Sequence, residues 1–134
     1  MTPDAKVLLL VERELDRLVN RAEEAIRQTD AAKRKDLEES QLRNLLNLAA
    51  ATDSIPAIKN FVAYQIGRKA LPDQFGKRVL SDLDAIQKEA QELCNENGIQ
   101  ERDRIARARA EMVRYYFGFL NRQFVADRKG GTKS

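Results

Sequence analysis

Apolar side chains recur every three or four residues along most of this chain, and that spacing constrains its fold most strongly. The pattern runs from Leu8 through Leu18 to Ala25, and again from Phe75 to Leu93. Such a period places apolar side chains on one face of a helix, whereas a half-buried strand needs strict alternation. The sequence therefore predicts an all-α fold, and no internal repeat or hairpin signal competes with it.

Prolines, glycines and capping residues divide this pattern into about five helices. Ser54-Ile55-Pro56 is a typical helix start, Pro72 ends that helix, and Asn97-Gly98 is a strong stop. We expect the first helix to run unbroken from Thr2-Pro3 to about Gln28. Breaks are predicted near residues 29–36, 52–55, 71–73 and 97–99.

The chain is long enough for one domain with a substantial core. We expect a single helical bundle over residues 1–126, followed by a short disordered basic tail over residues 127–134.

The chain contains no histidine, which removes Ser–His and Cys–His pairs and histidine-containing zinc sites. It also has no Gly-rich phosphate loop, no Asp-rich metal loop and no apolar run long enough for a membrane span. The lone Cys94 excludes an internal disulfide, and we expect it to be a small buried residue of a protein in a reducing cytosol. These features predict a cytoplasmic binding protein, not an enzyme, without cofactor or metal and without a membrane partner.

Positive charge gathers in the last quarter of the chain. The net charge is +3, but residues 99–134 hold nine Lys or Arg against four acids, which indicates an anionic partner. On the last helix, four arginines lie opposite the apolar face of Ile105, Met112 and Phe119. Their row suits a phosphate backbone, although for the row alone we favour a solvated face on which Glu111 pairs with its neighbours. The four are Arg104, Arg107, Arg114 and Arg122.

A second basic cluster surrounds the end of the helix that begins at Ser54. Tyr64 and Arg68 are one turn apart and share a face, and Lys69 follows. Gly67 lowers helix stability by about 1 kcal/mol relative to alanine. The expected compensation is close approach, either of a ligand backbone or, as we favour, of a neighbouring helix.

Two sets of apolar residues exceed what one buried face per helix requires. Val113, Phe117 and Phe124 form a second flank on the last helix, and Leu9 and Leu10 add to the first. Either these residues belong to a thicker core, or they contact a protein partner or a second copy of the chain.

Three stretches, in order, resemble one known family. Ser40-Gln41-Leu42-Arg43 is similar to its Ser-Gln-Ile-Arg helix start, and Ala63 to Arg68 is similar to its Ala-Tyr-x-x-Gly-Arg segment. Val113-Arg114-Tyr115-Tyr116-Phe117 resembles its closing aromatic helix. The family is the small all-helical subunit of type III CRISPR-Cas interference complexes, of the Csm type. The first helix matches it poorly, and Gly118 stands where the family pattern has a larger residue.

The resemblance implies a non-catalytic subunit of an antiviral ribonucleoprotein complex. Copies of it would stack beside other type III effector subunits, line the channel for guide RNA and target RNA, and hold the RNA backbone without reading bases. Arg43 and Arg68 are then the foremost RNA contacts, with Tyr64 packing or stacking. The full set of expected RNA-binding residues is Arg43, Lys59, Tyr64, Arg68, Lys69, Lys77, Arg78, Arg107 and Arg114.

Two other functions fit a small basic helical bundle. One is a protein–protein adaptor or oligomerisation bundle whose arginines only face solvent and have no role in nucleic-acid binding. The other is a DNA-binding regulator, although no helix-turn-helix with a polar recognition helix stands out.

Overall fold

The computed structural model describes residues 2–131, and within them it contains six α-helices, one short 3₁₀ helix and no strand. The all-α prediction is confirmed, with six helices in place of about five. None of these helices has the length and apolarity needed to cross a bilayer. The elements are α1 (Pro3–Glu12), α2 (Leu15–Gln28), η1 (Ala31–Lys33), α3 (Glu39–Ala51), α4 (Ile55–Gly67), α5 (Asp73–Glu96) and α6 (Arg102–Gly131).

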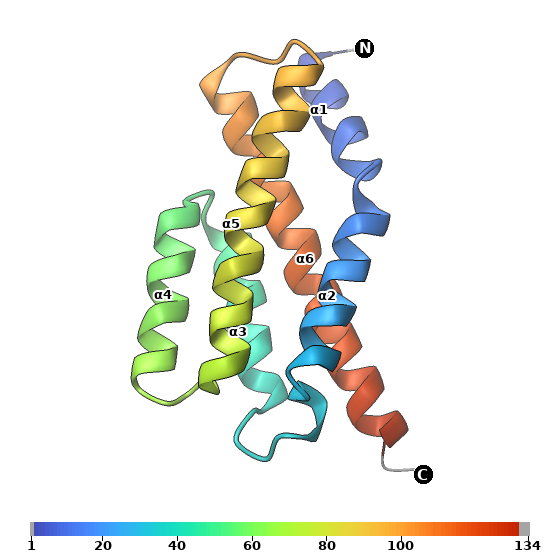
Figure 1. The fold of residues 1–134 in the computed structure, drawn as a ribbon. Helices are drawn as coiled ribbons and strands as arrows, with labels where there is room; N and C mark the ends of the chain where they lie inside the picture. Colours follow the sequence, from blue (N-terminus) through green and yellow to red (C-terminus); the bar gives the residue numbers. More distant parts are fainter. Residues whose placement is uncertain (1, 132–134) are drawn as a thin grey trace.

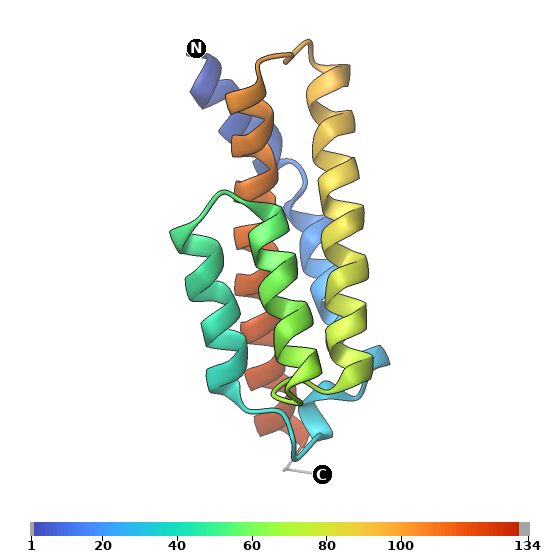
Figure 2. The same cartoon turned by 90° about the vertical axis from the view of Figure 1, so that its left-hand side faces the viewer.

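The longest helix, α6, runs the whole length of the molecule, with α5 along one side and α1 and α2 in succession along another (Figures 1 and 2). The pair α3 and α4 covers only the half that holds the C-terminus, α3 against α6 and α4 against α5. We call this half the C-terminal end. The opposite end is formed by α1, α5 and α6, where Lys6 Nζ donates a 3.0 Å hydrogen bond to the carbonyl of Asn97.

The core is built around the apolar side chains of α6. Tyr116, Phe117 and Phe124 are all at most 1% exposed, as is Val113. The flank formed by Val113, Phe117 and Phe124 therefore thickens the core and is not a partner surface. On α1, Leu10 is buried, whereas Leu8 and Leu9 remain exposed.

The first expected helix is divided in two, which corrects the prediction of one helix to Gln28. At Arg13 and Glu14 the backbone tightens into i→i−3 hydrogen bonds, from Arg13 N–H to Leu10 O (3.2 Å) and from Glu14 N–H to Val11 O (2.9 Å). No glycine or proline marks this position, so the break has no local signal in the sequence.

The expected boundary between the bundle and the tail lies too early, because α6 continues to Gly131. Arg128 stabilises this last part of the helix. Its Nε donates to the carbonyl of Ala32 at 3.1 Å, Nη2 donates to the carbonyl of Arg34, and its guanidinium lies 4.3 Å from the ring centroid of Phe124. Residues 127–131 thus belong to the bundle, and residues 132–134 lie outside the described residues.

A glycine does allow two helices to approach closely, but it is Gly76 and not Gly67. A Cβ added to Gly76 on α5 would overlap Cγ1 of Ile66 on α4 and would lie only 2.6 Å from Cδ1 of the same side chain. A Cβ added to Gly67 would meet nothing within 4 Å. The prediction that Gly67 packs against a neighbouring helix is therefore wrong, and its cost to the helix has no explanation in the packing.

This difference predicts opposite effects of the same substitution. Gly76→Ala is expected to lower the free energy of unfolding by about 1–3 kcal/mol, because Cγ1 of Ile66 must move and it is not the free end of a flexible chain. Gly67→Ala, the matched control, is expected to raise it by up to about 1 kcal/mol. Urea denaturation of the two variants measures both changes, and equal destabilisation would contradict this difference in packing.

Candidate nucleic-acid interface

The structure gathers part of the predicted RNA-binding set at the C-terminal end. The end of α4 lies beside the start of α3, and the side chain of Gln41 donates to the carbonyl of Ala70 between them. The same end also holds the first turns of α5 (Figure 2). It brings together Arg43, Tyr64, Arg68, Lys69 and Lys77, whereas Lys59 lies near the start of α4, and Arg107 and Arg114 lie in the first half of α6, away from this end.

The end of α4 presents an aromatic ring and two cations to solvent. Tyr64 is 58% exposed, and the guanidinium of Arg68 lies 5.6 Å from its ring centroid. Arg68 and Lys69 make no ion pair with any described residue. The ring and the guanidinium therefore form an exposed platform whose cationic groups are not neutralised by the fold.

At the end of α4, two residue types do not match the backbone conformations that they adopt. Lys69 has φ 62°, a left-handed conformation that glycine adopts without strain and that costs other residues about 1–2 kcal/mol. Gly67, two residues earlier, is helical and needs no such freedom. Stability alone would favour glycine at position 69 and a larger residue at position 67.

Four other predicted residues are held only by exposed ion pairs. Arg43 pairs with Glu39 at 2.9 Å, Lys77 with Asp73 at 2.9 Å, and Arg107 with Glu111 at 3.3 Å, each one helical turn apart. Lys59 on α4 reaches Asp84 on α5. Pairs of this kind contribute about 0–1 kcal/mol. These cations can therefore exchange their carboxylates for another anion at little cost.

Arg114 is engaged within the fold. Its Nε donates to the carbonyl of Ala49 in the last turn of α3 at 2.8 Å, and Nη2 bonds Asp53 at 2.6 Å, while Nη1 bonds Glu111 at 3.1 Å. The last carbonyls of a helix have no partner within it, so this arginine stabilises the end of α3. Of its side chain, 26% is exposed.

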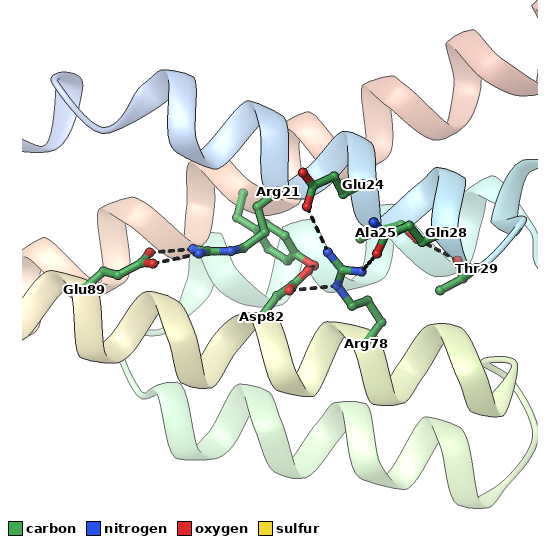
Figure 3. Close-up of polar contacts among 9 residues, drawn as sticks. Arg21, Glu24, Ala25, Gln28, Thr29, Arg78, Asp82 and Glu89 are labelled. Atoms are coloured by element: carbon green, nitrogen blue, oxygen red, sulfur yellow. Dashed lines mark hydrogen bonds and ion pairs between the residues drawn. The ribbon is translucent and has the colours of Figure 1, made fainter.

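Arg78 is likewise held by the fold, in a network between α2 and α5 (Figure 3). Its Nε donates to Oδ1 of Asp82 at 3.0 Å, Nη2 lies 3.6 Å from Glu24, and Nη1 donates to Gln28. Asp82 is 5% exposed, and the fully buried Tyr116 of α6 donates to its Oδ2 at 2.6 Å.

Burial raises the pKa of Asp82, and the hydrogen bonds from Tyr116 and Arg78 only partly oppose it. Burial beside that carboxylate also raises the pKa of Tyr116. Next to them, Arg21 holds Glu89 through two hydrogen bonds of 2.5 and 2.7 Å (Figure 3). Burial alone would raise the pKa of Glu89, but Arg21 and Arg17 outweigh it and lower the pKa.

The connection between α2 and α3 adds cations that the sequence-based prediction of RNA contacts did not include. Lys33 and Lys35 are exposed and form no ion pair with the described residues, whereas Arg34 is held by Asp36 through two 2.9 Å contacts. They border a cleft of about 1000 Å³ between this connection and the end of α6. The run of three basic residues is the sequence signal that could have indicated them.

Positive charge is consequently concentrated at the C-terminal end. Residues 27–43, 64–78 and 125–131 contain eleven of the 24 basic residues but only six of the 21 acids. A surface with this imbalance attracts polyanions.

Metal-binding and nucleophilic groups form no comparable arrangement within the described part of the chain. Burial raises the pKa of the Cys94 thiol, which disfavours the reactive thiolate, and the residue is buried as expected. Among residues 2–131, no group of three or more His, Cys, Asp or Glu side chains is placed to hold a metal ion.

Comparison with known proteins identifies no relative: no family model, no curated protein and no solved structure matches this chain. The functional interpretation therefore rests on the three motifs and on the basic surface of the C-terminal end.

The two roles of arginine on α6 predict different stabilities for two variants. Arg114→Ala is expected to lower the free energy of unfolding by about 1–3 kcal/mol, because the carbonyl of Ala49 loses its charged donor. Arg107→Ala, which breaks only an exposed ion pair, is expected to change it by less than about 0.5 kcal/mol. Chemical denaturation distinguishes them, and similar values for both would refute a structural role for Arg114.

The buried pair of Asp82 and Tyr116 predicts a pH-dependent loss of stability. Tyr116→Phe is expected to cost about 1–3 kcal/mol at neutral pH, because the Asp82 carboxylate loses a donor. The substitution raises the pKa of Asp82 further, so the folded variant holds a proton that the unfolded chain releases. The free energy of unfolding that the variant lacks relative to the wild type is therefore lost in full above this raised pKa. The loss shrinks as the pH falls toward the ordinary value of 3.8.

Denaturation of the wild type and of Tyr116→Phe across this pH range measures the difference. A deficit that stays constant, or that grows on acidification, would contradict the further rise in the pKa of Asp82 in the variant.

Proposed function

We propose that this chain is a non-catalytic small subunit of a cytoplasmic type III CRISPR ribonucleoprotein complex in antiviral defence. In this role it binds the backbone of guide or target RNA without reading the sequence. It packs there against neighbouring copies and against other effector subunits. The support is the order of the three family-like motifs, together with the basic surface on which two of them lie.

One observation carries the RNA-binding part of the proposal. The exposed Tyr64, Gly67, Arg68 and Lys69 lie together, and none of them is required by the packing of the bundle. Gly67 keeps one spot of the helix surface bare, so that a phosphate or sugar can approach the backbone closely. Arg68 presents a planar donor group that matches phosphate oxygens in pairs.

Neighbouring cations extend this surface in two directions. Arg43 and Lys77 add charges on α3 and α5 that are held only by exposed carboxylates, and Lys33 and Lys35 continue the charge onto the connection before α3. A run of exposed cations around one aromatic ring is typical of proteins that hold a single strand without sequence preference. We assign no RNA contact to Arg78 or Arg114, because their donors already serve the fold.

Arg68→Ala and Arg43→Ala are expected to weaken binding of a fluorescent oligouridylate, and to do so by a similar factor for other base compositions. Each substitution should also shallow the salt dependence, by a log–log slope of about 0.7 for every phosphate contact that it removes. Lys88→Ala is the matched control, because Lys88 is also an exposed cation without an ion pair among the described residues, but it lies away from the C-terminal end. Fluorescence anisotropy at several salt concentrations measures these effects.

Gly67→Val tests the bare surface directly, since it adds bulk where the fold leaves open space. It should weaken RNA binding while the protein remains folded. If these variants bind as the wild type does, or if Lys88→Ala weakens binding equally, the surface is not the RNA contact. A weakening that depends on the RNA sequence would refute backbone binding.

Membership of the complex is tested by purifying the tagged chain from its native host and sequencing the RNA that accompanies it. The expected result is short guide RNA together with other type III subunits. Stable protein partners without RNA would instead support the adaptor function.

A further inference from the structure

Another glycine that no neighbouring helix fills lies in a groove between α3 and α6. The groove has a volume of about 380 Å³ and is lined by Leu46 from α3 and by Tyr115, Gly118, Asn121 and Arg122 from α6. It lies on a different helix pair from the platform of Tyr64 and Arg68, and no family-like motif includes Gly118.

Gly118 is not explained by the packing of the bundle. A Cβ placed on it would meet only the end of the flexible Arg122 side chain, at 3.4 Å, which is an ordinary contact. A glycine in a helix interior lowers stability relative to alanine, so its presence here needs another reason. By contrast with Gly76, which a neighbouring helix fills, Gly118 faces only the movable end of the Arg122 side chain.

Asn121, which lines the groove, has a polar atom without a partner. Oδ1 of Asn121 is buried and accepts no hydrogen bond within the described part of the chain. Buried acceptors are almost always satisfied, and this oxygen has almost no accessible surface, so an N–H donor from outside the chain reaches it only after the Asn121 side chain turns toward the groove. A hydrocarbon side chain in the groove would leave the oxygen unsatisfied, which disfavours a purely apolar occupant.

Aromatic and cationic groups border the same groove. The ring of Tyr115 is stacked on Phe119, with centroids 6.1 Å apart and planes 17° apart, and the guanidinium of Arg122 lies 5.4 Å from the centroid of Phe119. Arg122 is exposed and has no ion pair among residues 2–131. The other charged residues of the lining, Glu111 and Arg114, are bonded to each other.

We propose that this groove binds the base of an unpaired nucleotide. The base lies against the ring of Tyr115 beside Gly118, the Asn121 side chain turns so that Oδ1 accepts from a base N–H, and Arg122 moves from Gly118 to the adjoining phosphate. This inference rests on the proposed function, since it names single-stranded RNA as the ligand and adds a base site to the backbone contacts. Every base has a stacking face and an N–H donor, so the site tolerates different sequences.

The test uses the full chain labelled with ¹⁵N and two probes, adenosine monophosphate and ribose 5-phosphate. Adenosine monophosphate, added up to about 10 mM, is expected to shift the backbone amide of Gly118 and the side-chain amide of Asn121 in ¹H–¹⁵N spectra. Ribose 5-phosphate lacks the base and is expected to leave the Asn121 signal unchanged.

Two variants separate the groove from the platform. Gly118→Leu fills the groove and should abolish the response to adenosine monophosphate, while circular dichroism shows the helices retained. Gly118→Ala is the milder second variant, expected to keep the fold and weaken the response. Gly67→Val, which alters only the platform, should leave the Asn121 shifts intact.

The base site is overturned if Asn121 and Gly118 do not shift with adenosine monophosphate, or if ribose 5-phosphate shifts Asn121 equally. It is also overturned if their signals change only with protein concentration, which would indicate a second copy in the groove. Failure of the proposed backbone binding has a different signature, because oligouridylate would then leave the amides of Gly67, Arg68 and Lys69 unshifted whatever the groove does.

Discussion

The hydrogen bond from Tyr116 to Asp82 is the contact on which the arrangement of the helices depends. It joins α6, the helix against which most of the others pack, to α5, and Arg78 extends it from the same carboxylate to α2. A carboxylate buried to this degree is tolerated only while its donors remain in place. A shift of α6 by one turn would leave the charge without them, so the buried polar group disfavours other alignments of an otherwise apolar core.

Arginine serves several different purposes in this chain. Arg78 serves a buried carboxylate, Arg114 stabilises the end of α3, and Arg128 holds the last turns of α6 against the connection before α3. Arg68 lies over the ring of Tyr64, makes no ion pair among the described residues and remains exposed. Because the first three cations are engaged inside the molecule, net charge overstates what a partner can contact, and the location of the exposed cations matters more.

The fold was predictable from the sequence where the signal was local. Apolar spacing predicted the helices, and Ser54-Ile55-Pro56 and Asn97-Gly98 marked real ends. The division at Arg13 has no residue signal, and the continuation of α6 depends on contacts between Arg128 and residues almost a hundred positions earlier. Such long-range contacts cannot be read from periodicity.

The candidate site was likewise predictable from the sequence only in part. The sequence placed Tyr64 and Arg68 on one face, and the structure retains them there. It could not distinguish Gly67 from Gly76, or Arg107 from Arg114, because each pair differs only in what the neighbouring helix brings to it. Helical spacing predicts which residues share a face, but not which of those faces another helix covers.

The division between α1 and α2 has a consequence for motion. Only Val7, Leu10 and Val11 of α1 are buried, and neither α3 nor α4 reaches that end of the molecule. Detaching this short helix at its tightened turn exposes far less apolar surface than unfolding the bundle, so its amides should exchange with solvent through a local opening. The basic surface lies at the far end of the molecule and includes no residue of α1, so it keeps its shape while this helix opens.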